Sequence, residues 1–79
     1  MAAYQLFHRI SDLESARVRR LLVQMGRQDI EFRNVDVSES AKDLMMQGLG
    51  RLQVPAILTG EGKWVVGFPE IEELLKRNG

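Results

Sequence analysis

Apolar residues change their spacing twice in the first half of the chain. Alternation of apolar and polar positions predicts a β-strand over residues 3–8. Apolar residues then recur at helical spacing from Leu13 to Met25, and the helix they predict ends at Gly26, because glycine readily adopts the left-handed C-cap conformation. Residues 30–37 return to strand spacing. The apolar positions are Leu13, Ala16, Val18, Leu21, Leu22 and Met25 in the helix, and Ile30, Phe32, Val35 and Val37 in the strand.

The second half of the chain predicts a helix followed by a β-hairpin. Either Ser38 or Ser40 caps the helix. Its inner face is formed by Ala41, Leu44, Met45 and Gly48. Residues 54–58 predict a strand that opens with a proline, and the glycine-rich turn at 60–62 leads into a strand over 63–66. Because the turn is short, these two strands are expected to be antiparallel neighbours.

A last helix completes the order βαβαββα. It begins at Pro69, since proline fits the first turn of a helix, and places Ile71, Leu74 and Leu75 on one face. The first helix connects its flanking strands by a crossover, which makes those strands parallel. The pattern therefore predicts one α/β domain over residues 1–79, with a four-stranded mixed sheet in the order 2-1-3-4 flanked by three helices.

The start of the first helix carries the capping-box pattern Ser11-Asp12-Leu13-Glu14. In this interpretation the Ser11 hydroxyl accepts a hydrogen bond from the amide three residues later, and Glu14 reaches back to the amide of Ser11. Asp12 and Glu14 also suit the positive end of the helix dipole. The substitution Ser11→Ala would then cost on the order of 1 kcal/mol of stability.

Composition and charge exclude several classes of function. Eleven basic residues balance eleven acidic ones, so neither nucleic acid nor an anionic membrane is expected as a partner. No apolar run is long enough to span a bilayer, and the first ten residues lack a signal-peptide pattern, so a cytoplasmic location is expected. The chain has no cysteine, which removes disulfides, zinc–thiolate sites and thiol catalysis; no metal site is expected.

These elements and a few short motifs resemble a glutaredoxin along essentially the whole chain. The motifs are Phe7-His8-Arg9 before the first helix, Ala16 to Leu22 within it, Val54-Pro55 four residues after Gly50, and Gly67-Phe68 before the last helix. The resemblance implies the thioredoxin/glutaredoxin fold. It also implies a cis peptide bond between Val54 and Pro55, close to the start of the first helix.

The largest departure from the glutaredoxin pattern lies at the start of the first helix. Glutaredoxins carry Cys-x-x-Cys or a single cysteine there, and this tetrad falls on Asp12, Leu13, Glu14 and Ser15. A carboxylate is a poor attacker of disulfide sulfur and cannot replace a thiolate. No catalytic residue is therefore assigned, and thiol–disulfide oxidoreductase activity is not expected.

The resemblance also implies a glutathione groove that is only partly kept. The backbone of Val54 would bind the cysteinyl part, and Arg9 would meet the glycine carboxylate. The γ-glutamyl carboxylate would be held by amides at Phe68 and Pro69, but proline has no amide. Asp12 adds negative charge near a negatively charged tripeptide. No cofactor is assigned, and glutathione is expected to bind in the millimolar range or not at all.

Two functions fit this sequence. The first is a binding module for an unidentified protein or peptide, using a groove formed by Arg9, Ser11, Asp12, Val54, Pro55 and Phe68, with Trp64 as a neighbour. The second is a glutathione-binding domain similar to the N-terminal half of a glutathione transferase, with Ser11 in place of cysteine. Transferases have a Glu/Gln-Ser pair at the last helix, whereas this chain has Phe68-Pro69-Glu70, and they add a helical domain.

Several residues near these motifs can also be explained by a purely structural role. His8 has no acidic or cysteine partner at motif spacing, so a structural role is expected. Trp64 and Phe68 fit half-buried packing positions. The arginines of the first helix fit a solvent-facing surface, and as an alternative they would form a docking face for an acidic partner. They are Arg17, Arg19, Arg20 and Arg27.

Overall fold

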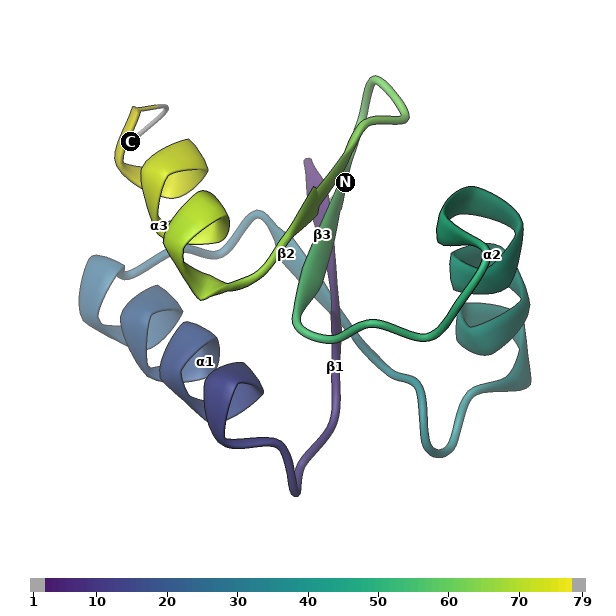
Figure 1. Ribbon diagram of the computed structural model, residues 1–79. Helices are drawn as coiled ribbons and strands as arrows, with labels where there is room; N and C mark the ends of the chain where they lie inside the picture. Colours follow the sequence, from purple (N-terminus) through teal and green to yellow (C-terminus); the bar gives the residue numbers. More distant parts are fainter. Residues whose placement is uncertain (1–2, 78–79) are drawn as a thin grey trace.

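The computed structural model describes residues 3–77 and forms a four-stranded mixed sheet with helices on both faces (Figure 1). The ends of the predicted domain, residues 1–2 and 78–79, lie outside the described residues. The elements are β1 (Tyr4–His8), α1 (Leu13–Met25), β2 (Ile30–Asn34), α2 (Glu39–Leu49), β3 (Ala56–Thr59), β4 (Trp64–Val66) and α3 (Phe68–Arg77). The spatial order β2-β1-β3-β4 confirms the sequence prediction, with β1 parallel to β2 and antiparallel to β3, and β4 antiparallel to β3.

The alternation along β1 divides the interior into two cores. Leu6 points to one face of the sheet, and Phe7 points to the other. The core around Leu6 is closed by α1 and α3 and contains Val18, Leu22, Ile57, Ile71 and Leu75. The core around Phe7 is closed by α2 and contains Val35, Ala41, Met45 and Ala56. Figure 1 shows α1 and α3 together on one side of the sheet and α2 alone on the other.

Both of the longer helices end at a glycine, as the sequence predicts for α1. Gly26 (φ +67°) and Gly50 (φ +77°) adopt the left-handed conformation at the C-caps of α1 and α2. At the start of α2, the Ser38 hydroxyl accepts a hydrogen bond from the Ala41 amide at 3.2 Å. Ser38 is therefore the cap, and the hydroxyl of Ser40 instead accepts from the Arg33 guanidinium.

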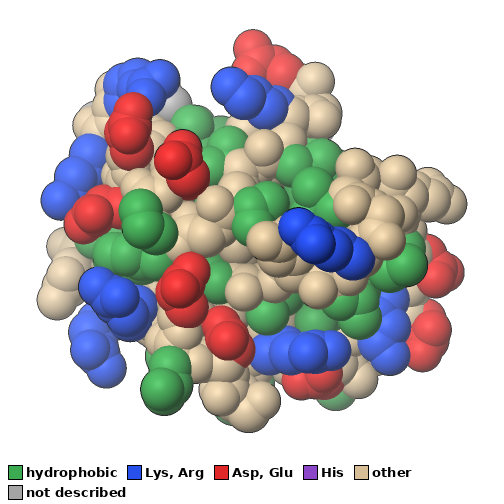
Figure 2. Space-filling model, viewed as in Figure 1, with side chains coloured by type: hydrophobic (Ala, Val, Ile, Leu, Met, Phe, Trp, Pro, Cys, Tyr) green, Lys and Arg blue, Asp and Glu red, His purple; other side chains and the backbone are tan. Residues whose placement is uncertain are grey.

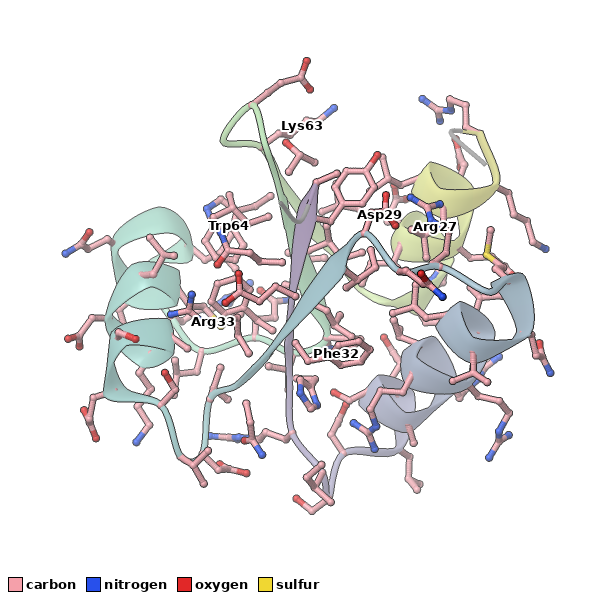
Figure 3. The ribbon with its side chains drawn as sticks, turned by 180° about the vertical axis from the view of Figure 1, so that it is seen from behind. Arg27, Asp29, Phe32, Arg33, Lys63 and Trp64 are labelled. Carbon is pink, nitrogen blue, oxygen red and sulfur yellow. The ribbon has the colours of Figure 1, made fainter. Side chains whose placement is uncertain are left out.

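Close approach of α2 to the edge strand β4 depends on Gly48. A Cβ atom at this position would overlap the indole ring of Trp64. The same indole contacts the buried ring of Phe7, with 4.9 Å between the ring centroids. Figure 3 shows Trp64 on the α2 side of the sheet. The predicted stripe of α2 therefore faces the sheet, with its smallest residue opposite the largest side chain of β4.

Several details of the sequence prediction are wrong. The strand predicted over 54–58 is β3 (Ala56–Thr59), so Val54 and Pro55 precede it. β2 ends at Asn34 rather than at residue 37, because the carbonyl of Asn34 accepts the amides of Val37 and Ser38 and turns the chain. Phe32 lies on this edge strand with 48% of its surface exposed and is not a core residue. Leu13 is 82% exposed and does not belong to the apolar stripe of α1, whose buried residues are Ser15, Val18 and Leu22.

Candidate functional site

The segments of the predicted groove meet at one end of the sheet. The pairing of β1 with β3 reaches Phe7 and Ala56, so Val54–Pro55 continues beside the loop 9–12 that follows β1. The Gly67 amide donates to the Pro55 carbonyl at 2.9 Å, which brings the start of α3 to the same place. The loop 9–12, Val54–Pro55 and Phe68 thus lie close to the N-terminus of α1.

The backbone of Val54 is unpaired at this end of the sheet. The Val54–Pro55 peptide bond is cis, and the Pro55 side chain is buried while Val54 is half-buried. Within residues 3–77, no hydrogen bond engages the amide or the carbonyl of Val54. An unpaired N–H and C=O beside the end of a strand can be satisfied by the backbone of another chain.

Asp12, not Ser11, caps α1. Asp12 has extended backbone angles, and its Oδ2 accepts a hydrogen bond from the Ser15 amide at 2.7 Å. The helix therefore begins one residue later than the Ser11 capping box requires. Ser11 is exposed in the preceding turn, where the Asp12 amide donates to the Arg9 carbonyl. Both a serine and an aspartate suit an N-cap, and here the carboxylate takes that position.

Removal of the Asp12 carboxylate should therefore destabilise the domain more than removal of the Ser11 hydroxyl. We expect Asp12→Ala to lower the free energy of unfolding by about 1 kcal/mol, since it removes the N-cap of α1. Ser11→Ala should change it by less than about 0.5 kcal/mol, as for an ordinary surface substitution. Urea denaturation of the two variants measures the difference. Equal losses would show that both side chains contribute to the cap.

Glu14 extends away from its own helix and caps α3 instead. Its Oε1 accepts a hydrogen bond from the Phe68 amide at 2.8 Å, across 54 residues of sequence. The Arg17 guanidinium lies 4.2 Å from the centroid of the half-buried Phe68 ring. Through these contacts α1 holds the start of α3. The amide that the glutaredoxin resemblance assigns to a ligand carboxylate is already bound to a carboxylate of this chain.

Arg9 also has partners within the domain. Its Nε lies 2.9 Å from Oδ1 of Asp36, as an ion pair without the alignment of a hydrogen bond. Its backbone amide donates to the hydroxyl of the buried Ser15 at 3.3 Å. Both charged groups are partly exposed, and ion pairs of this kind contribute about 0–1 kcal/mol. A ligand anion would have to compete with Asp36 for Arg9.

The arginines of α1 are more engaged than the predicted solvent-facing surface implies. Arg19 donates from Nη1 to the Arg9 carbonyl at 3.1 Å and approaches Nδ1 of His8 at the same distance. Arg27, after the end of α1, forms a two-point pair with Asp29, with Nε–Oδ1 and Nη2–Oδ2 distances of 2.9 and 2.7 Å (Figure 3). Arg17 stacks on the ring of Phe68. These contacts give three of the four predicted stripe arginines a structural role.

His8 is a buried structural histidine at the end of β1. Burial, and secondly the positive charge of Arg19, hold the pKa of His8 below its ordinary value of 6.5. The neutral ring can then accept a hydrogen bond from Arg19, and its edge contacts the ring of Phe32. This arrangement supports the carbonyl of Arg9 in the loop that enters the site.

The lowered pKa of His8 predicts how stability depends on pH. The unfolded chain takes up a proton near pH 6.5, whereas the folded domain does so only at lower pH. The free energy of unfolding should therefore decrease as the pH falls from 7.5 to 5.5. In His8→Gln, which keeps an acceptor for Arg19 but does not titrate, the decrease should be smaller. An identical pH dependence in both proteins would contradict this origin.

Two exposed apolar side chains flank the site. The sequence analysis did not predict that either of them forms part of this surface. Ile10 is 66% exposed in the entry loop, and Leu13 is 82% exposed at the first position of α1. The sequence did hold a signal for Leu13. At about 100° per residue, Leu13 and Leu22 lie on opposite sides of the helix, so both cannot face the same core. Solvent-exposed leucine and isoleucine next to an unpaired backbone segment favour contact with an apolar partner.

The described residues contain no cluster of three or more histidine, aspartate or glutamate side chains that could hold a metal ion. No helix within residues 3–77 is long and apolar enough to cross a membrane. Charged side chains at this end of the sheet have partners within the domain. Asp12 accepts from the Ser15 amide, Glu14 accepts from the Phe68 amide, and Arg9 pairs with Asp36. The Val54 backbone and the exposed apolar side chains are not engaged in this way by any of the residues 3–77.

Comparison with known proteins supports the glutaredoxin resemblance at the level of structure. No protein-family model and no curated protein matches the chain. The holo form of glutaredoxin C1 from Populus tremula × tremuloides is 26% identical, with a TM-score of 0.72 over 98% of this chain and 77% of that one. A buckwheat glutaredoxin–glutathione complex is 20% identical, with a TM-score of 0.72 over 96% and 70% of the two chains.

A thioredoxin-like protein, BC3987, matches over nearly its whole length. It is 18% identical, with a TM-score of 0.75 over 92% of this chain and 96% of that one. The fold is thus that of thioredoxins and glutaredoxins. More narrowly, the chain is a glutaredoxin-like protein without cysteine.

Proposed function

We propose that this domain binds an extended segment of another protein at the groove formed by loop 9–12, Val54–Pro55 and Phe68. The observation that carries this proposal is the backbone of Val54 next to the start of β3, which has no hydrogen-bond partner within residues 3–77. A partner segment can add to such a backbone through main-chain hydrogen bonds, which give affinity without requiring a particular side chain.

We propose further that the domain does not carry out thiol–disulfide exchange. The chain has no cysteine, and the residue at the place of the glutaredoxin nucleophile is Asp12. Its carboxylate is used to cap α1 by accepting the Ser15 amide. A carboxylate in this position stabilises the helix and offers no sulfur for a mixed disulfide.

The contacts of the site favour an apolar, internal segment over a carboxylate ligand. Glu14 already accepts the Phe68 amide, and Asp36 lies against Arg9, so neither anion position is free. Ile10 and Leu13 offer exposed apolar surface beside the groove. A partner that places one apolar side chain against Leu13 and pairs its backbone with Val54 satisfies both features.

The glutathione-binding alternative requires contacts that other groups in this chain occupy. It needs the Phe68 amide for a carboxylate, and Glu14 holds that amide. It also gives Ser11 the task of stabilising a thiolate, and Ser11 lies in an exposed turn outside the helix. Since Ser11 is not the N-cap, the dipole of α1 acts mainly on Asp12. Peptide binding is therefore the function that we propose.

A random linear peptide library displayed on phage can test this proposal, with the purified domain as target. Selected peptides are then titrated into the wild type, Leu13→Glu and Val23→Glu. The two variants are matched, because Leu13 and Val23 are both about 80% exposed and lie at opposite ends of α1. We expect Leu13→Glu to weaken binding at least about tenfold, because it replaces apolar contact by a charge, and Val23→Glu to leave it unchanged.

Amide shifts on titration with a selected peptide should include Val54, whose N–H gains a partner. Circular dichroism checks that both variants remain folded, and a glutamate in the first turn of α1 is compatible with the helix dipole. Peptides that bind both variants equally, or a selection that yields no peptide, would refute the groove as the binding surface.

A further inference from the structure

A second open surface lies on the opposite edge of the sheet from β2. Within residues 3–77, β4 pairs with β3 on one side and with no strand on its other side. The Lys63 carbonyl accepts the Thr59 amide, and the Gly67 amide donates to Pro55, both at 2.9 Å. In an antiparallel pair such bonding alternates, so residues 63, 65 and 67 bond toward β3. The N–H and C=O groups of Trp64 and Val66 therefore point outward, away from the sheet.

A cavity of about 340 Å³ lies beside this edge, between β4 and α3. Val65 and Leu74 form its apolar lining, and charged residues of both signs stand around it. Glu73 and Arg77 pair with each other along α3. Within residues 3–77, Lys63 and Glu70 form no ion pair, although both line this cavity. Figure 2 shows side chains of both charges and hydrophobic side chains together on one face of the molecule.

We propose that a second copy of this chain pairs its β4 with this β4, antiparallel and about a two-fold axis that passes Val65. In that register Trp64 of each copy stands opposite Val66 of the other, and both have their backbone groups directed outward. Two hydrogen-bonded pairs result, with two N–H···O=C bonds in each. The two Val65 side chains meet at the axis, beside the cavities.

Charge favours a second copy over another partner. The symmetric register places Lys63 opposite Gly67 of the second copy, three residues before its Glu70. Each copy thus brings an unpaired cation to an unpaired anion of the other, twice by symmetry. An isologous interface requires a surface that complements itself. Each copy carries one base, Lys63, and one acid, Glu70, beside its cavity, so two copies of this surface complement each other. A three-residue strand gives a small interface, so association should be weak.

Sedimentation of the full chain between about 10 μM and 1 mM tests this dimer, a range chosen to bracket the affinity expected of a small interface. Lys63→Glu should weaken association at least about tenfold, because each introduced carboxylate then faces Glu70 of the other copy and the two like charges repel. The charge exchange Lys63→Glu with Glu70→Lys should restore it to within about threefold, since both pairs reform with opposite polarity. Arg20→Glu, which makes the same change of charge at an exposed position of α1, should leave association unchanged.

The side chains of Lys63 and Glu70 are exposed, so the variants are expected to fold, which circular dichroism can check. Hydrogen exchange at high concentration should slow for the amides of Trp64 and Val66. A chain that stays monomeric at 1 mM overturns the proposal. Association that the charge exchange does not restore, or protection that appears at β2 instead, overturns it equally. None of these outcomes depends on the groove at Val54.

Discussion

Replacing Asp12 with cysteine should give this chain a reactive thiol with a pKa below about 8.5, the ordinary value for cysteine. Oδ2 of Asp12 accepts the Ser15 amide at the N-cap of α1, and a thiolate in its place would receive the same amide and the helix dipole. At pH 7 a lowering of the pKa by one unit from the ordinary value raises the alkylation rate roughly threefold, because the larger thiolate fraction outweighs the lower nucleophilicity until the pKa nears the ambient pH. The rate of reaction with iodoacetamide across pH measures the pKa.

Val23→Cys provides the matched control for this thiol. Val23 is exposed near the C-terminal end of the same helix, where the dipole disfavours a negative charge. Its thiol should titrate at or above the ordinary cysteine value. Two thiols with the same pKa would mean that the N-terminus of α1 does not activate a nucleophile, and the place of Asp12 would then not correspond to the glutaredoxin active site.

Phe7→Ala should cause the largest loss of stability, about 3–5 kcal/mol. Phe7 is fully buried, contacts Trp64, and joins β1 to α2 in one of two small cores. Truncation removes apolar contact and leaves a cavity that so small a core cannot close. Domains of this size have about 5–15 kcal/mol of total stability, so much of the chain would be unfolded at 37 °C. Urea and thermal denaturation measure the effect.

Phe32→Ala is the control for this substitution. It removes the same atoms from the neighbouring strand β2, where the ring is 48% exposed. We expect a loss of about 1 kcal/mol or less, since little buried surface and no cavity are involved. Similar losses for the two variants would contradict the placement of Phe7 in a buried core and of Phe32 outside it.

The fold could be predicted from sequence because its determinants are local. Alternation along β1, the glycine after α1, and the short turn before β4 each fix one step of the topology. Parallel pairing of β1 with β2 then follows from the connecting helix. The end of β2 was misplaced because Val35 remains buried after the strand has ended, so hydrophobicity alone continues the pattern beyond Asn34.

The site could be predicted only in outline. Val54–Pro55 and the start of α3 were found because their motifs are contiguous in sequence. The bond from Glu14 to the Phe68 amide joins residues 54 apart, and no local pattern reports such a contact. The capping box suggested that Glu14 would reach back to Ser11, because Ser11 and Glu14 have the spacing of that motif; Asp12 next to it is an equally suitable N-cap residue. Whether Ser11 or Asp12 caps the helix depends on tertiary contacts, and the spacing of apolar residues does not report these.

Titration of reduced glutathione into ¹⁵N-labelled protein tests most directly whether this groove has exchanged an anionic tripeptide site for a peptide-binding surface. Glu14 occupies the Phe68 amide, Asp36 pairs with Arg9, and residue 69 is a proline. The loss of two charge-assisted contacts, at about 1.5–3 kcal/mol each, weakens a micromolar site by at least about a hundredfold. We therefore expect a dissociation constant in the millimolar range, or no shift of the Val54 and Phe68 amides; a micromolar constant with shifts at these amides would contradict the proposed function.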